Sequence, residues 1–427
     1  MIGLWTGALA ATLTVGPDGA HATPCAAIAA AAEGDTIEVD AAGDYAGDTC
    51  AWSTDRLTIR GVNGRPVLDG TGAALAQQKG IFVIQAPTST VENLEFRGAQ
   101  VADHNGAGIR HQGTDLLVRD CAFVDNENGI LGSPTVDGTG RVEIVRSVFE
   151  HNGAGDGYSH NLYLGHYAEV SFRASYSHRG KVGHLLKSRA AYTEIVASRL
   201  SDEAGGAASY EIDLPNGGEA WIVGSVVEQV ATTENSAIVS FGAEGAGGNT
   251  VMALHVLNST LVNHHDRGSF LSVGSGVTTP VEVVNTVFVG PGTLSTQVST
   301  TFVTSWDDSL GDAGLRDAAA LDLVPTAASA LVDAGTTPTT FSVDAQYVHP
   351  AGETPRGVSG AAIDIGAYEY GNPGADDLDT GDADTAGGEA DTAGDGDAAT
   401  ACGCGANAPS GAAAALLGLV LLRRRRR

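Results

Sequence analysis

Residues 142–149 read VEIVRSVF, a short alternating apolar run followed by a small polar residue and then an aromatic residue. The end of this phrase returns about every 26 residues, and such a period indicates stacked units that bury their apolar faces only against one another. We therefore expect the end residues of the copies to be buried along one interior line. These residues are Phe96, Phe123, Phe149, Tyr176, Leu200, Val227, Leu261 and Phe288.

Each unit contains short strands rather than helices. Alternating runs such as residues 281–284 are separated by Gly and Asn, as at residues 126–129, and a second short strand follows each turn, as at residues 184–187. Leucine-rich repeats are the alternative at this period, but the repeated units over residues 96–288 contain no LxxLxL phrase. Two or three short strands per unit describe one coil of a parallel β-helix. On this pattern the chain resembles the pectate-lyase-like right-handed parallel β-helix family over residues 13–370, which implies a single all-β solenoid.

The two ends of this region fit one domain. The Ala-rich residues 26–32 predict the short helix that often caps the first coil and shields its open edge. Residues 355–357 and 363–369 look like the closing segment common in the same family. We expect a monomer.

Composition favours export and excludes some partners. The formal net charge is −28, and lysine is nearly absent, so we expect no nucleic acid partner. Cys25 and Cys50 flank the first coil and could form a disulfide, which leaves Cys121 buried in a coil. Residues 1–12 are apolar and resemble a secretory signal, although they could instead be the first strand of the fold.

The C-terminal part changes character after about Tyr370. Residues 371–400 are dominated by Asp, Gly, Ala and Thr, which predicts a disordered acidic linker. Residues 401–427 contain Cys402 and Cys404, then a short apolar run and five arginines. This order resembles the myxobacterial C-terminal sorting domain. The resemblance implies export, processing near one of these cysteines and display at the cell surface, with membrane contact only through this segment; a plain tail anchor is the alternative.

The polar side chains concentrate in three consecutive units. Aligning the second strands on Leu162, Leu186 and Ile212 places the following residues in one column on the outer face, with Leu131 before them and Ser240 after them. Parallel strands lie about 4.8 Å apart, so a phenol, an ammonium and a carboxylate would stand side by side. This column is Tyr163, Lys187 and Asp213, and Arg189 shares the face of Lys187.

A second aligned set lies at the starts of the same strands. It consists of His160, His184 and Tyr210, each one residue before the positions expected to face outward, Asn161, Leu185 and Glu211. Strict alternation would turn the side chains of this histidine set inward. Whether these side chains are exposed is therefore not decided by the sequence. Asn216 lies in a Pro-Asn-Gly-Gly turn that would form a wall beside the column. The structural alternative is that Lys187 and Asp213 form only a cross-strand ion pair.

These residue types suit β-elimination on a uronic-acid polysaccharide. The C5 proton of a uronate becomes acidic when its carboxylate is neutralised, which Arg189 or a bound calcium ion could do. Lys187, Tyr163 or a neutral histidine could remove the proton, and Tyr163 or Tyr210 could protonate the departing oxygen. We therefore predict Lys187, Tyr163 and Arg189 as catalytic residues. The predicted substrate-binding residues are His160, Asn161, His184, Tyr210, Asp213 and Asn216.

Other functions remain open on this fold. The segment of residues 210–215 is faintly similar to the Tyr-Gly-Ile-Asp-Pro-His segment of uronan C5-epimerases, but it lacks the final histidine. A glycoside hydrolase would use the neighbouring carboxylates Asp202, Glu203, Glu211 and Asp213. A surface protein that binds glycan without catalysis is the third alternative, because fold alone does not fix function.

Overall fold

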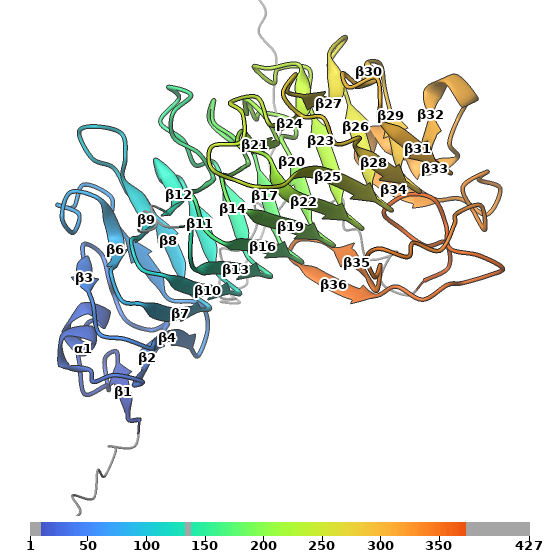
Figure 1. Ribbon diagram of the computed structural model, residues 1–427. Helices are drawn as coiled ribbons and strands as arrows, with labels where there is room; N and C mark the ends of the chain where they lie inside the picture. The colour runs from blue at the N-terminus through green and yellow to red at the C-terminus, as the bar shows by residue number, and fades with distance from the viewer. Residues whose placement is uncertain (1–9, 133–137, 373–427) are drawn as a thin grey trace, which may run out of the picture. The chain divides into compact units, whose positions relative to one another are not determined.

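The computed structural model describes residues 10–132 and 138–372 of the 427-residue chain. From Cys50 to Asp307 the strands follow one another in a fixed order through three sheets, here called B, A and C, and neighbouring strands within each of these sheets are parallel. The protein is therefore a single parallel β-helix, as the repeated phrase predicts (Figure 1).

The described residues belong to one compact unit, Met1–Thr380, while a second unit, Gly381–Arg427, lies outside them. The predicted acidic linker and sorting segment fall almost wholly outside the described residues, as does most of the predicted signal segment. No helix among the described residues is long and apolar enough to cross a membrane.

Sheet A consists of β1 (Thr12–Val15), β2 (Thr36–Asp40), β4 (Leu57–Val62), β7 (Thr88–Glu92), β10 (Asp115–Arg119), β13 (Arg141–Val145), β16 (Glu169–Arg173), β19 (Tyr192–Val196), β22 (Gly218–Val223), β25 (Met252–Leu257), β28 (Glu282–Val284) and β31 (Thr301–Val303). Sheet B consists of β3 (Cys50–Trp52), β6 (Gly80–Ile84), β9 (Ala107–His111), β12 (Asn128–Gly132), β15 (Leu162–Leu164), β18 (Leu186–Ser188), β21 (Ile212–Leu214), β24 (Ala237–Phe241), β27 (Ser269–Val273) and β30 (Thr293–Ser295). Sheet C consists of β5 (Val67–Asp69), β8 (Glu95–Arg97), β11 (Ala122–Val124), β14 (Val148–Glu150), β17 (Tyr176–His178), β20 (Arg199–Ser201), β23 (Val226–Gln229), β26 (Thr260–Asn263), β29 (Val287–Val289) and β32 (Trp306–Asp307). The remaining elements are the helices α1 (Pro24–Ala30), η1 (Asp308–Leu310) and η2 (Ala318–Ala320) and the antiparallel pairs β33 (Leu315–Asp317) with β34 (Asp322–Pro325) and β35 (Ala345–Val348) with β36 (Gly352–Pro355).

The small residue of the repeated phrase forms a ladder at the turn between sheets A and C. The hydroxyl of Ser147 accepts the N–H of Cys121 at 3.2 Å, and Ser175 accepts the N–H of Ser147 at 3.1 Å. The same bond recurs in the following coils through Ser198, Ser225 and Ser259. A buried backbone N–H needs a hydrogen-bond acceptor. The serine hydroxyl supplies this acceptor to the turn of the preceding coil and so fixes how the two coils align.

The aromatic residues of the phrase stack inside the coils as expected. Phe123 pairs in register with Phe96 and Phe149, and its ring centroid lies 5.1 Å and 4.7 Å from theirs. Stacked, fully buried rings of this size contribute strongly to the core. From Leu200 onward the same inner position continues through Val227, Leu261 and Phe288.

Tyr176 departs from this line, and its predicted place in it was wrong. Phe149 pairs with Ser177, so Tyr176 is shifted by one position and turns to the outer face of sheet C. The inner space is filled by Phe172 of β16, whose ring centroid lies 6.1 Å from that of Phe149. Tyr176 is buried by other means: its ring stacks on His178 at 4.0 Å.

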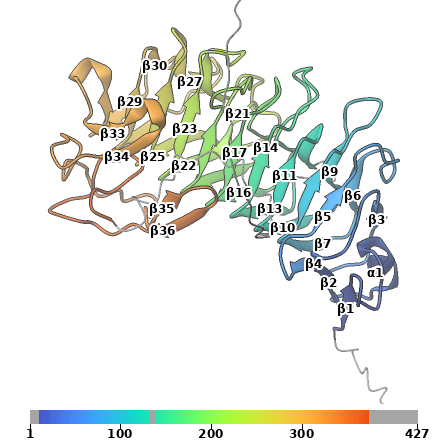
Figure 2. The same ribbon diagram turned by 180° about the vertical axis from the view of Figure 1, so that it is seen from behind.

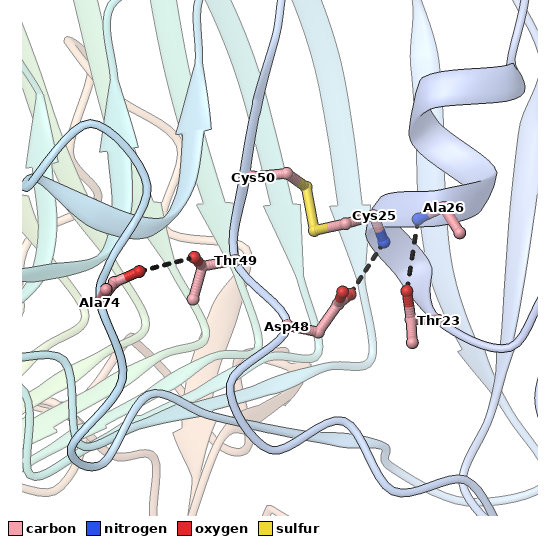
Figure 3. The surroundings of a disulfide bond; sticks show 7 residues. All are labelled: Thr23, Cys25, Ala26, Asp48, Thr49, Cys50 and Ala74. Atoms are coloured by element: carbon pink, nitrogen blue, oxygen red, sulfur yellow. Dashed lines mark hydrogen bonds between the residues drawn. A yellow bond between two sulfur atoms is a disulfide. The ribbon is translucent and has the colours of Figure 1, made fainter.

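The first coil is closed by the predicted cap. Helix α1 begins at Pro24, with Thr23 as its N-cap, and buries Ala27 and Ile28 against the core. Cys25 and Cys50 form the expected disulfide, with Cα atoms 5.7 Å apart, beside a hydrogen bond from the Cys25 N–H to Asp48 (Figure 3). Cys121 is a buried free thiol, as predicted.

The predicted closing segment packs back along the solenoid. Arg356 and Glu369 form a fully buried ion pair at 3.3 Å. Strands β35 and β36 lie beside sheet A (Figure 2), where Ala345 packs on Val196 and Trp221. Tyr368 packs on Val226 of sheet C. The closing segment therefore contacts sheets A and C.

Candidate functional site

The outer face of sheet B carries the predicted column. Tyr163 of β15 pairs in register with Lys187 of β18, which pairs with Asp213 of β21. Leu131 precedes this column and Ser240 follows it, as the alignment predicts. The inward aliphatic residues fix this register, because a shift by one residue would turn all of them out of the core.

Lys187 and Asp213 form a close ion pair. Nζ of Lys187 lies 2.9 Å from Oδ2 of Asp213, and their side chains are 13% and 6% exposed. Nε2 of His184 lies 3.4 Å from the same carboxylate oxygen. Asp213 therefore fixes the position of Lys187 from one side, while the ring of Tyr163 lies 5.6 Å from Nζ on the other side.

Arg189 follows β18 and is held by three side chains. Its Nε donates to the Tyr163 hydroxyl at 2.9 Å, and its Nη1 donates to Oδ1 of Asn216 at 2.6 Å. Nη1 and Nη2 meet the two carboxylate oxygens of Glu244 at 2.7 and 3.2 Å. Burial opposes the charge of the guanidinium, but the bonds to Glu244 and Tyr163 outweigh it and raise the pKa of Arg189. The hydrogen bond from Arg189 lowers the pKa of Glu244, so both groups are charged.

The histidine set forms a stacked ladder beside the column. The rings of His160 and His184 stack at 4.5 Å, and the ring of Tyr210 follows at 5.2 Å. Nδ1 of His160 accepts the N–H of His184, and Nδ1 of His184 accepts the N–H of Tyr210. Burial lowers the pKa of His160 and lowers that of His184 to about 4. Both imidazoles are therefore neutral at neutral pH and carry their proton on Nε2.

Three residues predicted to face outward are instead buried. Asn161, Leu185 and Glu211 are 0% exposed, and this part of the prediction was wrong. All three lie in the bend before a strand of sheet B, where the two-residue alternation of a strand does not apply. Asn161 donates to the carbonyl of His178 at 2.9 Å inside the coil. It is a structural residue rather than a substrate-binding one.

Asn216 is also buried, at 4% exposure, but it serves the site. Its Oδ1 accepts from Arg189, and its Nδ2 donates to the carbonyl of Gly245 at 3.2 Å. Asn216 therefore positions both the guanidinium and the loop that carries Glu244.

The carboxylates that a hydrolase would need do not share one site. Asp213 lies on sheet B, whereas Glu203 is held by Arg199 and Tyr176 beside sheet C. Asp202 and Glu211 are fully buried, and neither carboxylate oxygen of Glu211 has a hydrogen-bond partner among the described residues. Burial raises the pKa of Glu211 well above its usual value and raises that of Asp202 to about 7.

Sequence reasoning did not find Glu244. It lies in the loop of residues 242–251 that follows β24, far from Arg189 in the chain. The unusually wide gap between Val227 and Leu261 indicates that this unit carries an insertion. That gap was the available signal, but it does not show which loop residue reaches the column.

No group of three or more His, Cys, Asp or Glu side chains is arranged to hold a metal ion in residues 10–132 and 138–372. A role for calcium stays a prediction.

The chain matches no protein-family profile and no curated protein sequence. Among solved structures it is similar to the crystal structure of pectate lyase Pel9A, with 15% identity and a TM-score of 0.56, over 85% of this chain and 97% of the other. It is also similar to the crystal structure of an alginate lyase from Paenibacillus sp. str. FPU-7, with 14% identity and a TM-score of 0.40, over 69% and 97% of the two chains. At this identity the first similarity shows that the chain has a pectate-lyase-like β-helix fold, and the second is too distant to add to it.

Proposed function

We propose that this protein is a polysaccharide lyase that cleaves a uronic-acid glycan by β-elimination on the outer face of sheet B. The observation that carries the proposal is the arrangement around Arg189. Its guanidinium is fixed by Tyr163 and Asn216 and holds a carboxylate through two nitrogens, beside the paired Lys187 and Asp213.

The Glu244 carboxylate stands where a substrate carboxylate would bind. Glu244 is 53% exposed and comes from a loop, whereas Arg189 is 17% exposed and lies at the end of a core strand. A uronate could therefore take the place of Glu244 while the guanidinium stays fixed. A guanidinium pairs with a carboxylate through two parallel bonds, which gives both binding energy and orientation.

The elimination requires a base next to this pair. With the carboxylate neutralised, Lys187 takes the proton from C5 after its ammonium has passed a proton to the paired Asp213 carboxylate, and the electrons of the C5–H bond form a double bond between C4 and C5. The bond between C4 and O4 then breaks. O4 takes a proton from an acid, so that the products are a new reducing end and a 4,5-unsaturated sugar.

Two tyrosines are placed to supply that proton. The Tyr163 oxygen accepts the bond from Arg189, which leaves its own proton available to O4. Tyr210 stacks on His184, and burial together with the Asp213 carboxylate raises the pKa of Tyr210, which keeps its hydroxyl protonated. Asp213 holds the Lys187 side chain in position.

The alternatives differ in their products. A C5-epimerase would share the proton abstraction but would not break the bond to O4. A binding protein would retain the glycan unchanged. A hydrolase is disfavoured, because its candidate carboxylates lie on different faces or in the core.

The proposed location is outside the cell, held at the surface by residues 401–427. The disulfide between Cys25 and Cys50 supports export, because such bonds persist in oxidising compartments.

The test is incubation of the full chain with polygalacturonate, polymannuronate, polyguluronate and chondroitin, with the ultraviolet absorbance of the unsaturated product as the readout. We expect the absorbance to rise with one of these glycans. New reducing ends without absorbance would indicate hydrolysis, C5 inversion without cleavage would indicate epimerisation, and either would contradict the proposal.

A further inference from the structure

Arg110 is a half-buried arginine that feels the charge of the Asp103 carboxylate but forms an ion pair with no acidic side chain among the described residues. Within residues 10–132 and 138–372 it makes no hydrogen bond or ion pair, and its Nε is buried without a partner. Other shielded arginines pair with carboxylates, as Arg199 does with Glu203 at 2.7 Å. Taking a cation from water without a partner is costly. In a chain with a formal net charge of −28, an unpaired arginine at such a place indicates a ligand with negative charge.

Arg110 lies in the same outer column as the candidate site. In sheet B, Arg110 of β9 pairs with Leu131, Leu131 with Tyr163, and Tyr163 with Lys187. Three strand spacings therefore separate Arg110 from Lys187, which is about 14 Å along the solenoid axis. The alignment of strands that predicted the column would have included Arg110 had it been extended by one more unit.

The surface between the two ends suits a sugar chain. Between Arg110 and Lys187 the column holds Leu131, which is 6% exposed, and the partly exposed Tyr163 ring. Gln112 lies two residues after Arg110, just as Arg189 lies two residues after Lys187. The side chain of Gln112 accepts a hydrogen bond of 3.2 Å from Gln85. Pyranose rings pack on apolar floors, while amides and cations bind their hydroxyls and carboxylates.

We propose that Arg110 binds the carboxylate of a second uronate in the same glycan, so that the polysaccharide lies along the solenoid axis across β9, β12, β15 and β18. This rests on the proposed function and deepens it: the substrate is a run of about four or more sugars, because one sugar unit advances a chain by roughly one strand spacing. Such a site distinguishes a glycan that carries a second uronate about three sugars away from a glycan that carries a single uronate.

The experiment compares long and short substrates of the uronan that the wild-type full chain cleaves. Arg110→Gln should lower kcat/KM for octamers about tenfold, equivalent to about 1.4 kcal/mol, and should affect trimers much less. Arg110→Lys should lie between, since an ammonium keeps the charge but loses the paired bonds. Arg267→Gln is the matched control, because Arg267 is an exposed arginine on the loop after β26 and its replacement removes the same charge.

Thermal unfolding of Arg110→Gln serves as the check on folding. An equal loss on trimers and octamers would overturn the proposal, because it would indicate a role in the fold or in the chemistry. No loss on octamers would overturn it as well.

A failure of the proposed lyase function gives a different result from a failure of the Arg110 site. If the wild-type chain cleaves no uronan, its binding to polygalacturonate and polymannuronate is measured by calorimetry. Binding that Arg110→Gln weakens and Arg267→Gln does not would support the carboxylate site while refuting the lyase. Absence of any dependence on Arg110 would refute both.

Discussion

Replacement of Glu244 by glutamine tests whether its carboxylate occupies the place of the substrate. Glu244 meets Arg189 at 2.7 and 3.2 Å, and a substrate carboxylate must displace it before it can bind. Because Glu244 is 53% exposed, the pair is screened by water and contributes about 0.2 to 1 kcal/mol. Removal of this competitor should therefore lower KM by up to about fivefold, with kcat little changed.

The assay is steady-state kinetics on the cleaved uronan, at low and high salt. Glu33→Gln is the matched control, because Glu33 and Arg56 form another exposed pair in the first coil. The decrease in KM should shrink at high salt, where the competing pair is already weakened. A rise in KM for Glu244→Gln would refute the reasoning, because it would show that Glu244 positions Arg189 for the substrate instead of competing with it.

Three further predictions concern other parts of the chain. Arg189→Lys should raise KM and lower kcat in the same assay, because the paired bonds to a carboxylate are lost; unchanged kinetics would exclude Arg189 from the site. Burial raises the pKa of Asp202 to about 7, so between about pH 4 and pH 7 the folded state keeps a proton that the unfolded state releases. The contribution of Asp202 to the free energy of unfolding is therefore lost as the pH rises from about 4 to about 7. The free energy of unfolding of Asp202→Asn relative to wild type should therefore rise between pH 4 and 7, by at most about 4 kcal/mol, and a flat difference would contradict the pKa. Deletion of residues 401–427 should release the protein into the medium, and equal retention on the cells of the shortened and full-length chains would contradict surface anchoring.

The sequence predicts most of the fold because the coil is a repeat. The position of Lys187 opposite Tyr163 and Asp213 follows from short strands whose inward aliphatic residues allow one register. The place of Tyr176 could not be predicted in this way. Whether an aromatic residue fits inside a coil depends on the space left by the other strands, and there Phe172 already fills it.

The limits of the site prediction lie at bends and loops. Alternation fails at Asn161 and Glu211 because the chain bends between sheets C and B at these positions. Glu244 reaches Arg189 from an inserted loop, and the path of such a loop is not encoded in the repeat. The buried Nε of Arg110 has no hydrogen-bond partner among the described residues, and the sequence does not show which arginines are paired.

The most direct measurement is the rate of unsaturated-product formation by Lys187→Ala on the uronan that the wild-type chain cleaves. Lys181→Ala is the control, because Lys181 is also ion-paired, to Asp125 at 2.7 Å, but lies on a loop beside sheet C. A general base contributes roughly 10²- to 10⁴-fold in rate, so we expect a loss of this size for Lys187→Ala, with folding retained and with Lys181→Ala close to wild type. A Lys187→Ala variant that eliminates at the wild-type rate would show that the base lies elsewhere and would contradict the proposed site.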